Sequence, residues 1–131
     1  MTALLDTHVL LYWFEEGGRL SAAQRHVLAG ASAEFPLFVL DITLWEVATL
    51  HSLKRITLDR PLRVWLERAT APPLVSRIGI SPAIAAEVDR IPDSFHRDPA
   101  DRIIVATAIV LGAVLVTNDR RIRDASLVPT V

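Results

Sequence analysis

Residues 98–119, DPADRIIVATAIVLGAVLVTND, decide the fold. Asp98 and Pro99 form a cap and first-turn pair for a helix, and the apolar residues that follow point in every direction around its axis. A helix that is apolar all round is buried, so we expect this one to lie across the centre of the fold. Gly112 then ends the helix, and Val114–Val116 is predicted to be a buried strand.

The remainder of the chain alternates short apolar runs with segments of helical pattern. Strands are predicted at residues 3–5, 37–40, 74–80 and 114–116, with a fifth at 127–128, and helices at residues 8–16, 21–32, 42–55, 60–71, 81–90 and 98–112. The first helix is expected to stop at Gly17-Gly18. Short strands that alternate with helices predict an α/β fold, in which a parallel sheet is covered by helices on both faces.

The composition describes an apolar and nearly neutral chain. It has 131 residues, of which 51% are apolar, a formal net charge of -1 and no cysteine. This length predicts a single domain over residues 1–131, and the apolar fraction excludes a disordered chain. The lack of cysteine, of a membrane-spanning apolar run and of a basic leader favours a cytoplasmic protein without membrane attachment. The charge balance argues against nucleic-acid binding by bulk electrostatics.

Acidic residues follow two of the predicted strands. Asp6 comes directly after the first strand, and Thr117-Asn118-Asp119 after the fourth. Parallel α/β folds bind ligands beyond the carboxyl ends of their strands, so these side chains suggest a shared site. Each acid taken alone is also explained as a helix cap or a turn residue.

Glu46 is predicted to point inward or into a cleft. It falls inside the helical arc marked by Ile42, Leu50 and Leu53. A buried lone carboxylate must be protonated, paired or bound to a metal ion. An internal ion pair with Arg102 or another basic group is the alternative that needs no metal.

The long apolar helix begins with two acids. Asp98 and Asp101 occupy its cap and third position, where carboxylates complement free backbone amides. We expect Asp98 to be the cap and Asp101 to be the site residue, because the end of a buried helix lies against the sheet. Arg102 is expected either to pair with one of these acids or to contact a substrate phosphate.

Four acids are thus candidates for one cluster above the sheet, namely Asp6, Glu46, Asp101 and Asp119. So many like charges need a counter-ion, because each carboxylate raises the pKa of the others. An all-oxygen ligand set selects Mg²⁺ or Mn²⁺ over zinc or copper.

The same segments resemble the PIN-domain family, and specifically the VapC-type toxins of bacterial toxin-antitoxin pairs. The matching segments are LLDTHVLLYW, TLWEVA, HRDPADRIIVATA and LVTNDRRI, which span residues 1 to about 124. The resemblance implies a three-layer α/β/α fold with a short parallel sheet of order 3-2-1-4-5. It also implies a Mg²⁺- or Mn²⁺-dependent endoribonuclease that forms a homodimer and is inhibited by a cognate VapB-like antitoxin covering the active site.

By this resemblance Asp6, Glu46, Asp101 and Asp119 match the acidic quartet of the family, and Thr117 matches a hydroxyl position beside it. We expect Asp6 and Asp101 to hold the metal, with Glu46 and Asp119 completing the ligand set, supporting it or taking the proton of the attacking water.

One local departure from the family pattern is Asp41, where the family often has a small hydroxyl residue. It either adds a fifth acid at the rim or caps the helix of Glu46, and we favour the cap.

Basic residues outside the quartet are candidates for RNA contacts. Arg120, Arg121 and Arg123 cluster after the fourth strand, and Lys54-Arg55 end the helix of Glu46. The alternative is a solvated surface with favourable charge at a helix end.

Other functions find less support in the sequence. The four histidines show no ligand spacing and are expected to be structural or superficial, and no nucleotide-binding or nucleophile-elbow motif is present. The serious alternative is a PIN-like binding or regulatory protein with little or no nuclease activity, in which apolar residues such as Trp13, Phe14 and Trp65 form a partner surface.

Overall fold

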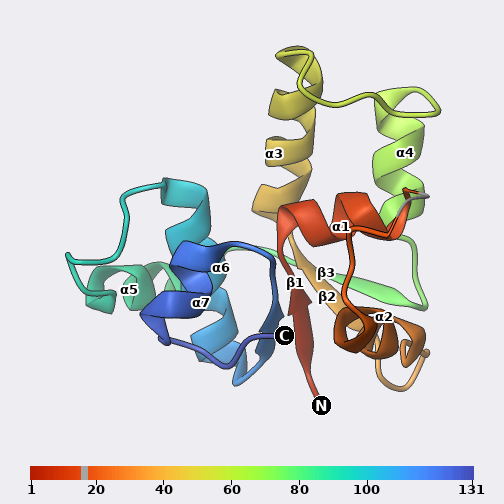
Figure 1. The fold of residues 1–131 in the computed structure, drawn as a ribbon. Helices are drawn as coiled ribbons and strands as arrows, with labels where there is room; N and C mark the ends of the chain where they lie inside the picture. Colours follow the sequence, from red (N-terminus) through yellow and green to blue (C-terminus); the bar gives the residue numbers. More distant parts are fainter. Residues whose placement is uncertain (16–17) are drawn as a thin grey trace.

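A computed structural model describes residues 1–15 and 18–131 (Figure 1). Its centre is a sheet of four short parallel strands in the order β3-β2-β1-β4. The strands are β1 (Ala3–Leu5), β2 (Leu37–Leu40), β3 (Val75–Ile78) and β4 (Val114–Val116). Leu4 of β1 pairs with Phe38 on one side and with Leu115 on the other. The predicted α/β class with a parallel sheet is confirmed.

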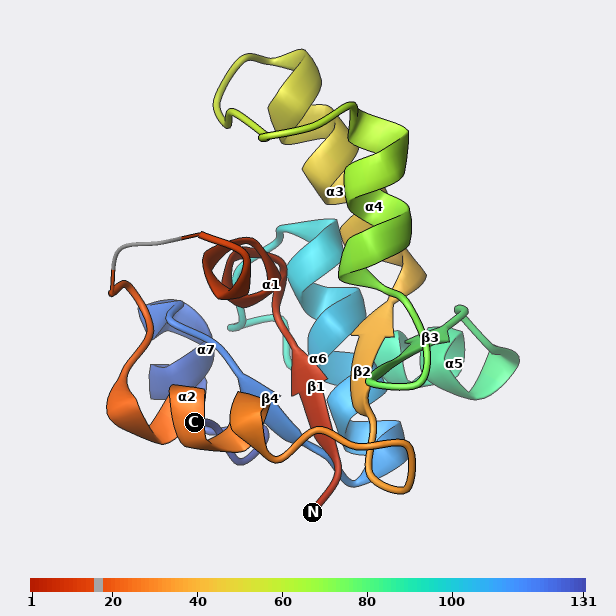
Figure 2. The same ribbon diagram turned by 90° about the vertical axis from the view of Figure 1, so that its right-hand side faces the viewer.

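The helices form layers on both faces of this sheet (Figures 1 and 2). They are α1 (Thr7–Trp13), α2 (Ala22–Ala29), α3 (Asp41–Ser52), α4 (Leu62–Ala69), α5 (Pro82–Arg90), α6 (Pro99–Leu111) and α7 (Arg120–Ala125). Successive residues of β1 face opposite layers, so Ala3 and Leu5 pack in one core with α1, α2 and α4, whereas Leu4 packs in the other with α5, α6 and α7. The sheet is therefore buried on both faces.

The sequence pattern explains the position of α6. Asp98 caps its N-terminus, Pro99 occupies its first turn, and Gly112 ends it in the left-handed conformation with a φ of 60°. Ile104 and Val105 are fully buried. The predicted burial holds for the helix up to Ala108, whereas Ile109 and Val110 near its C-terminal end are exposed. The buried part fixes the place of the acids at the first turn.

The predicted fifth strand at 127–128 is wrong. Val128 is instead buried in the core beside α6, and the chain returns to the sheet edge only at Pro129–Val131. There a single bridge joins Thr130 to Leu115. Pro129 has no amide hydrogen to extend a ladder, and no fifth strand forms in the part of the chain that the structure describes. The four strands keep the order 3-2-1-4 implied by the resemblance.

Several element boundaries differ from the predicted ones. The helix expected to reach Arg55 ends at Ser52, because Lys54 adopts a left-handed conformation with a φ of 58°. The first helix ends at Trp13 rather than at Glu16. Of the residues expected to stop it, Gly18 is described and adopts a positive φ of 73°, whereas Gly17 lies outside the described residues, as does Glu16. No helix in the described ranges is long and apolar enough to cross a membrane.

Candidate active site

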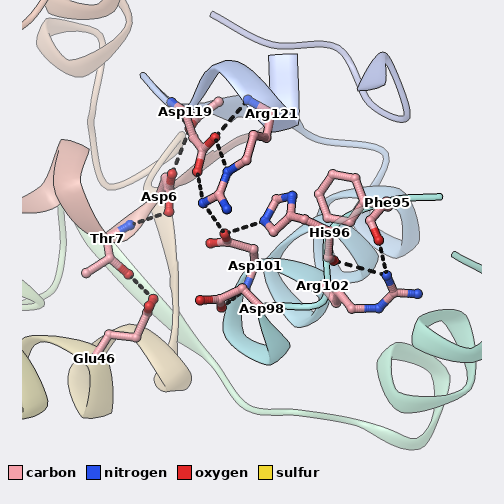
Figure 3. Close-up of polar contacts among 11 residues, drawn as sticks. Asp6, Thr7, Glu46, Phe95, His96, Asp98, Asp101, Arg102, Asp119 and Arg121 are labelled. Carbon is pink, nitrogen blue, oxygen red and sulfur yellow. Dashed lines mark hydrogen bonds and ion pairs between the residues drawn. The ribbon is translucent and has the colours of Figure 1, made fainter. Parts of the chain in front are cut away.

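The carboxyl end of the sheet opens into a cleft of about 320 Å³ (Figure 3). The structure places all four predicted acids on its walls, together with Asp98 and a single arginine. The lining residues are Asp6, Thr7, His8, Tyr12, Glu46, Asp98, Asp101, Asn118, Asp119 and Arg121. They come from the ends of β1 and β4 and from the helices α1, α3, α6 and α7.

Asp6 is the deepest of these acids. It follows β1 directly, and its side chain is only 6% exposed. Its Oδ1 accepts a hydrogen bond from the amide of Thr7 at 2.8 Å, and its Oδ2 accepts one from the hydroxyl of Thr117 at 2.6 Å. Burial raises the pKa of Asp6 above its ordinary value, against the opposing effect of these hydrogen bonds.

Glu46 enters the cleft from α3. Its Oε1 accepts a hydrogen bond from the hydroxyl of Thr7, which joins α3 to α1. Burial is the main cause that raises the pKa of Glu46 to about 7; the hydrogen bond from the Thr7 hydroxyl opposes it, and the charges of Asp6 and Asp101 act in the same direction as burial. The carboxyl group of Glu46 thus has no cationic partner among the described residues, and the alternative of an ion pair with Arg102 is not observed.

The first turn of α6 separates the roles of its two acids. Asp98 is the cap, because its Oδ1 accepts the amide hydrogen of Asp101 at 3.1 Å. Asp101 is only 9% exposed and turns its carboxylate into the cleft. Burial raises the pKa of Asp101, as do the charges of Asp6 and Asp98, although a hydrogen bond with His96 lowers it.

Asp119 lies at the mouth of the cleft. It caps α7 and accepts the amide hydrogen of Arg121 at 2.8 Å. Its own amide donates to the hydroxyl of Thr117 at 3.0 Å. Burial acts to raise the pKa of Asp119, but the hydrogen bonds and charge of Arg121 outweigh it and hold that pKa below its ordinary value.

Arg121 is the basic side chain nearest to the acids. Its Nη2 lies 3.2 Å from Oδ2 of Asp119 and 3.7 Å from Oδ2 of Asp101. The side chain is nevertheless 62% exposed, so it borders solvent as well as the cleft. Arg120 is exposed on the same helix, and Arg123 donates to the carbonyl of Thr117 at 2.7 Å.

His96 is a site residue that the sequence analysis missed. Its Nε2 lies 2.7 Å from Oδ2 of Asp101, and the ring is largely buried. One ligand atom each from His96, Asp101 and Asp119 lie within 4.8 Å of one another. The only signal in the sequence was the place of His96 inside the segment HRDPAD, five residues before Asp101.

Two further residues differ from expectation. Arg102 points away from the acids, and its guanidinium donates to the carbonyls of Ile91, Phe95 and His96 (Figure 3). Asp41 is not the cap of α3, because it is the first residue of that helix and makes no capping hydrogen bond. It pairs instead with Nε of Arg77 on β3 at 2.9 Å.

Comparison with known proteins shows the family of this chain. The chain matches the PIN domain over residues 3–127. This chain belongs to the PIN-domain family. It is also 43% identical over 123 residues to Ribonuclease VapC22 from Mycobacterium tuberculosis, an alignment that covers 94% of this chain and 91% of the relative. The predicted resemblance to VapC-type PIN proteins is confirmed.

Several solved structures share the fold of this chain. The crystal structure of VapBC2 from Rickettsia felis bound to a promoter DNA fragment matches with a TM-score of 0.73 at 15% identity, over 100% of this chain and 98% of that chain. The crystal structure of FitAcB from Neisseria gonorrhoeae matches with a TM-score of 0.70 at 21% identity, over 98% of this chain and 96% of that chain. A toxin-antitoxin complex from Klebsiella pneumoniae matches with a TM-score of 0.67 at 20% identity, over 99% of this chain and 96% of that chain.

The donor set of this PIN domain fits a divalent metal ion. Asp6, Glu46 and Asp101 are crowded carboxyl groups whose pKa values are all raised, so a bound cation would remove an existing electrostatic cost. Carboxylate oxygens are the ligands that Mg²⁺ and Mn²⁺ prefer. The exposed Arg121 side chain supplies positive charge mainly at the mouth of the cleft, next to Asp119.

Proposed function

We propose that this PIN-domain protein is a Mg²⁺- or Mn²⁺-dependent endoribonuclease that acts as the toxin of a toxin-antitoxin pair. The observation that carries the proposal is the convergence of Asp6, Glu46 and Asp101, three carboxyl groups of raised pKa, in one cleft at the carboxyl end of the sheet. The 43% identity to a mycobacterial protein named as a ribonuclease supports the same reaction class. The protein is then a hydrolase of RNA phosphodiester bonds.

Asp6 and Asp101 would hold the metal ion. Both are at most 9% exposed and rigidly placed, one by β1 and the other by the first turn of α6. Asp119 would complete the ligand set at the mouth. When bound, a divalent ion stabilises negative charge on the phosphate and the leaving oxygen and increases the acidity of bound water.

Glu46 is the residue best suited to receive the proton of the attacking water. Its Oε1 is held by the Thr7 hydroxyl, so Oε2 is the oxygen that would take the proton. A general base works best when its pKa lies near the operating pH, and the pKa of Glu46 is raised to about 7. Asp98 and Thr117 support the site by fixing Asp101 and Asp6, respectively.

The RNA backbone would approach the cleft past α7. Arg121 is exposed at its mouth and Arg120 is its exposed neighbour, so these two are the phosphate contacts that we propose. We do not include Arg102, because its donors are committed to backbone carbonyls of the loop before α6. A local basic edge beside the acids explains how a chain of net charge -1 binds a polyanion.

A VapB-like antitoxin is the proposed inhibitor, and we propose a homodimer as the toxin's own assembly. The matched structures include toxin-antitoxin complexes. A pocket lined by both apolar and polar residues, among them Leu11, Phe14, Ile56 and Trp65, offers a place for an antitoxin segment. Phe14 is 47% exposed and meets the edge of the Trp65 ring at a centroid distance of 5.7 Å. We expect this pair to act in the cytoplasm.

Expression in a bacterial host tests this function. The protein should arrest growth, and mapping of RNA ends should reveal new cleavage products. Co-expression of the small gene adjacent to its own should relieve the arrest, and the Asp6→Asn variant should cause neither arrest nor cleavage. Arrest that persists in Asp6→Asn without new RNA ends would favour the alternative, a regulatory protein that acts by binding alone.

A further inference from the structure

We infer that His96, held in place by Arg102, is a positioning residue that orients the carboxylate of Asp101 for the metal ion. This inference rests on the proposed metal-dependent function and adds two residues to its machinery. Neither belongs to the acidic quartet. The sequence predicts that Arg102 pairs with an acid or contacts a substrate phosphate, and that His96 is a structural or superficial histidine.

The contact between His96 and Asp101 is short and sheltered. Nε2 of His96 lies 2.7 Å from Oδ2 of Asp101, and the two side chains are 16% and 13% exposed. Nδ1 of His96 is buried and has no hydrogen-bond partner among the described residues. A neutral imidazole in this environment places its hydrogen on Nε2, where an acceptor is present, and leaves Nδ1 as a bare lone pair.

This tautomer argues against His96 as a metal ligand. If Nε2 bound the metal ion, the hydrogen of the ring would have to sit on Nδ1, which is buried without an acceptor. As a donor to Oδ2, His96 instead fixes the rotation of the Asp101 carboxylate. The other oxygen of Asp101, Oδ1, makes no hydrogen bond within the described residues and is left for the cation.

Arg102 fixes His96 from behind. Its Nη1 donates to the carbonyl of His96 at 3.2 Å and to that of Phe95 at 3.0 Å, and its Nη2 donates to the carbonyl of Ile91 at 3.1 Å. The buried Phe95 ring packs against the imidazole at a centroid distance of 4.2 Å. Loops are generally more mobile than helices and strands, and these hydrogen bonds fix the backbone of the loop that carries His96.

Two adjacent residues of α6 have different roles in this arrangement. Asp101 and Arg102 are adjacent on α6, yet their side chains point to different sides, one into the cleft and the other under the loop that carries His96 (Figure 3). Helix α6 thus supplies both Asp101 and Arg102, the residue that holds the loop of His96 in place. Partners of metal-binding side chains typically contribute about 10- to 100-fold to metal affinity.

The test is the Mn²⁺ affinity of the purified protein without RNA, measured by calorimetry. His96→Gln should stay within about threefold of the unmodified protein, because its amide nitrogen reaches as far as Nε2 and donates to Asp101. His96→Asn is too short and should weaken Mn²⁺ binding by about 10- to 100-fold. The exposed His51 on α3 provides a control, and His51→Asn should change nothing.

A double-mutant cycle extends the test to Arg102. Arg102→Lys cannot make the same three hydrogen bonds and should also weaken Mn²⁺ binding, whereas adding it to His96→Asn should cause little further loss, because both act through Asp101. Thermal unfolding without metal would confirm that each variant is folded.

If His96→Asn binds Mn²⁺ as tightly as the unmodified protein, or if His96→Gln loses as much Mn²⁺ affinity as His96→Asn, the inference is wrong. Normal Mn²⁺ binding without RNA cleavage would instead refute the proposed function and leave the role of His96 intact.

Discussion

The hydroxyl of Thr117 donates to Oδ2 of Asp6 at 2.6 Å, which joins the ends of β4 and β1 across 111 positions of sequence. The hydroxyl oxygen of Thr117 also accepts the amide hydrogen of Asp119 at 3.0 Å. One buried hydroxyl therefore fixes two acids of the cleft. Gln24 of α2 adds a second tie, because it donates to the carbonyl of Thr117 and to Oδ1 of Asn118.

Thr117→Val should destabilise the protein without changing the shape of its core. The substitution keeps the volume but leaves Oδ2 of Asp6 without its donor and the Asp119 amide without its acceptor. We expect the free energy of unfolding to fall by about 1–3 kcal/mol, measured in urea. Thr117→Ser keeps the hydroxyl and should recover most of the loss. A stable Thr117→Val beside a destabilised Thr117→Ser would mean that the methyl group, not the hydrogen bonds, is what matters.

Arg121→Gln should bind Mn²⁺ more tightly and RNA more weakly. In the metal-free protein, Arg121 contacts the carboxylates of Asp101 and Asp119, so a metal ion must compete with it. Removing two exposed ion pairs should lower the Mn²⁺ dissociation constant by about three- to tenfold. RNA binding should weaken, with the slope of log affinity against log salt reduced by about one.

The neighbouring Arg120 supplies the control for that experiment. Arg120→Gln removes the same charge from an exposed position of α7 and should leave Mn²⁺ affinity nearly unchanged. Equal tightening in both variants would show a general charge effect and would contradict direct competition by Arg121.

The stability of the metal-free protein should fall as the pH rises from about 5 to 8. The pKa of Glu46 is raised in the folded state from 4.5 to about 7, so this group stabilises the fold fully below its unfolded pKa and loses that contribution as the pH rises through 7. The raised pKa values of Asp6 and Asp101 act in the same direction. Thermal unfolding at several pH values measures the effect.

Two comparisons sharpen this pH prediction. Mn²⁺ should raise the melting temperature more at pH 8 than at pH 5, because it binds the ionised carboxylates. Glu46→Gln should flatten the decline of stability between pH 5 and 8 in the metal-free protein. A decline as steep as that of the unmodified protein would show that Glu46 is not its source.

Much of the fold follows from local sequence. Asp98, Pro99 and Gly112 mark the ends of α6, and the apolar residues between them predict its burial. The end of the chain was less predictable, because whether Val128 enters a strand or a core depends on what the rest of the fold leaves uncovered. Similarly, the left-handed turn at Lys54 ends α3 without a glycine to signal it.

The candidate site divides in the same way. Asp6, Asp119 and Glu46 were predictable because strand ends and a helical arc place them. His96 was not, because it lies in a loop, where periodicity carries no information about direction. The acids beside Arg102 in the sequence predict an ion pair with one of them or a contact with a substrate phosphate. Its partners are instead backbone carbonyls up to 11 residues away, which no pattern of side chains indicates.

The most direct test of the account is cleavage of RNA by the purified protein during titration with Mn²⁺, with Asp101→Asn as the matched variant. Asparagine keeps the size of the side chain and removes its charge, so the variant should remain folded by circular dichroism. We predict cleavage that rises with Mn²⁺, disappears with a chelator and is lost in Asp101→Asn. Cleavage that is independent of the metal ion, or that persists undiminished in Asp101→Asn, would contradict the account.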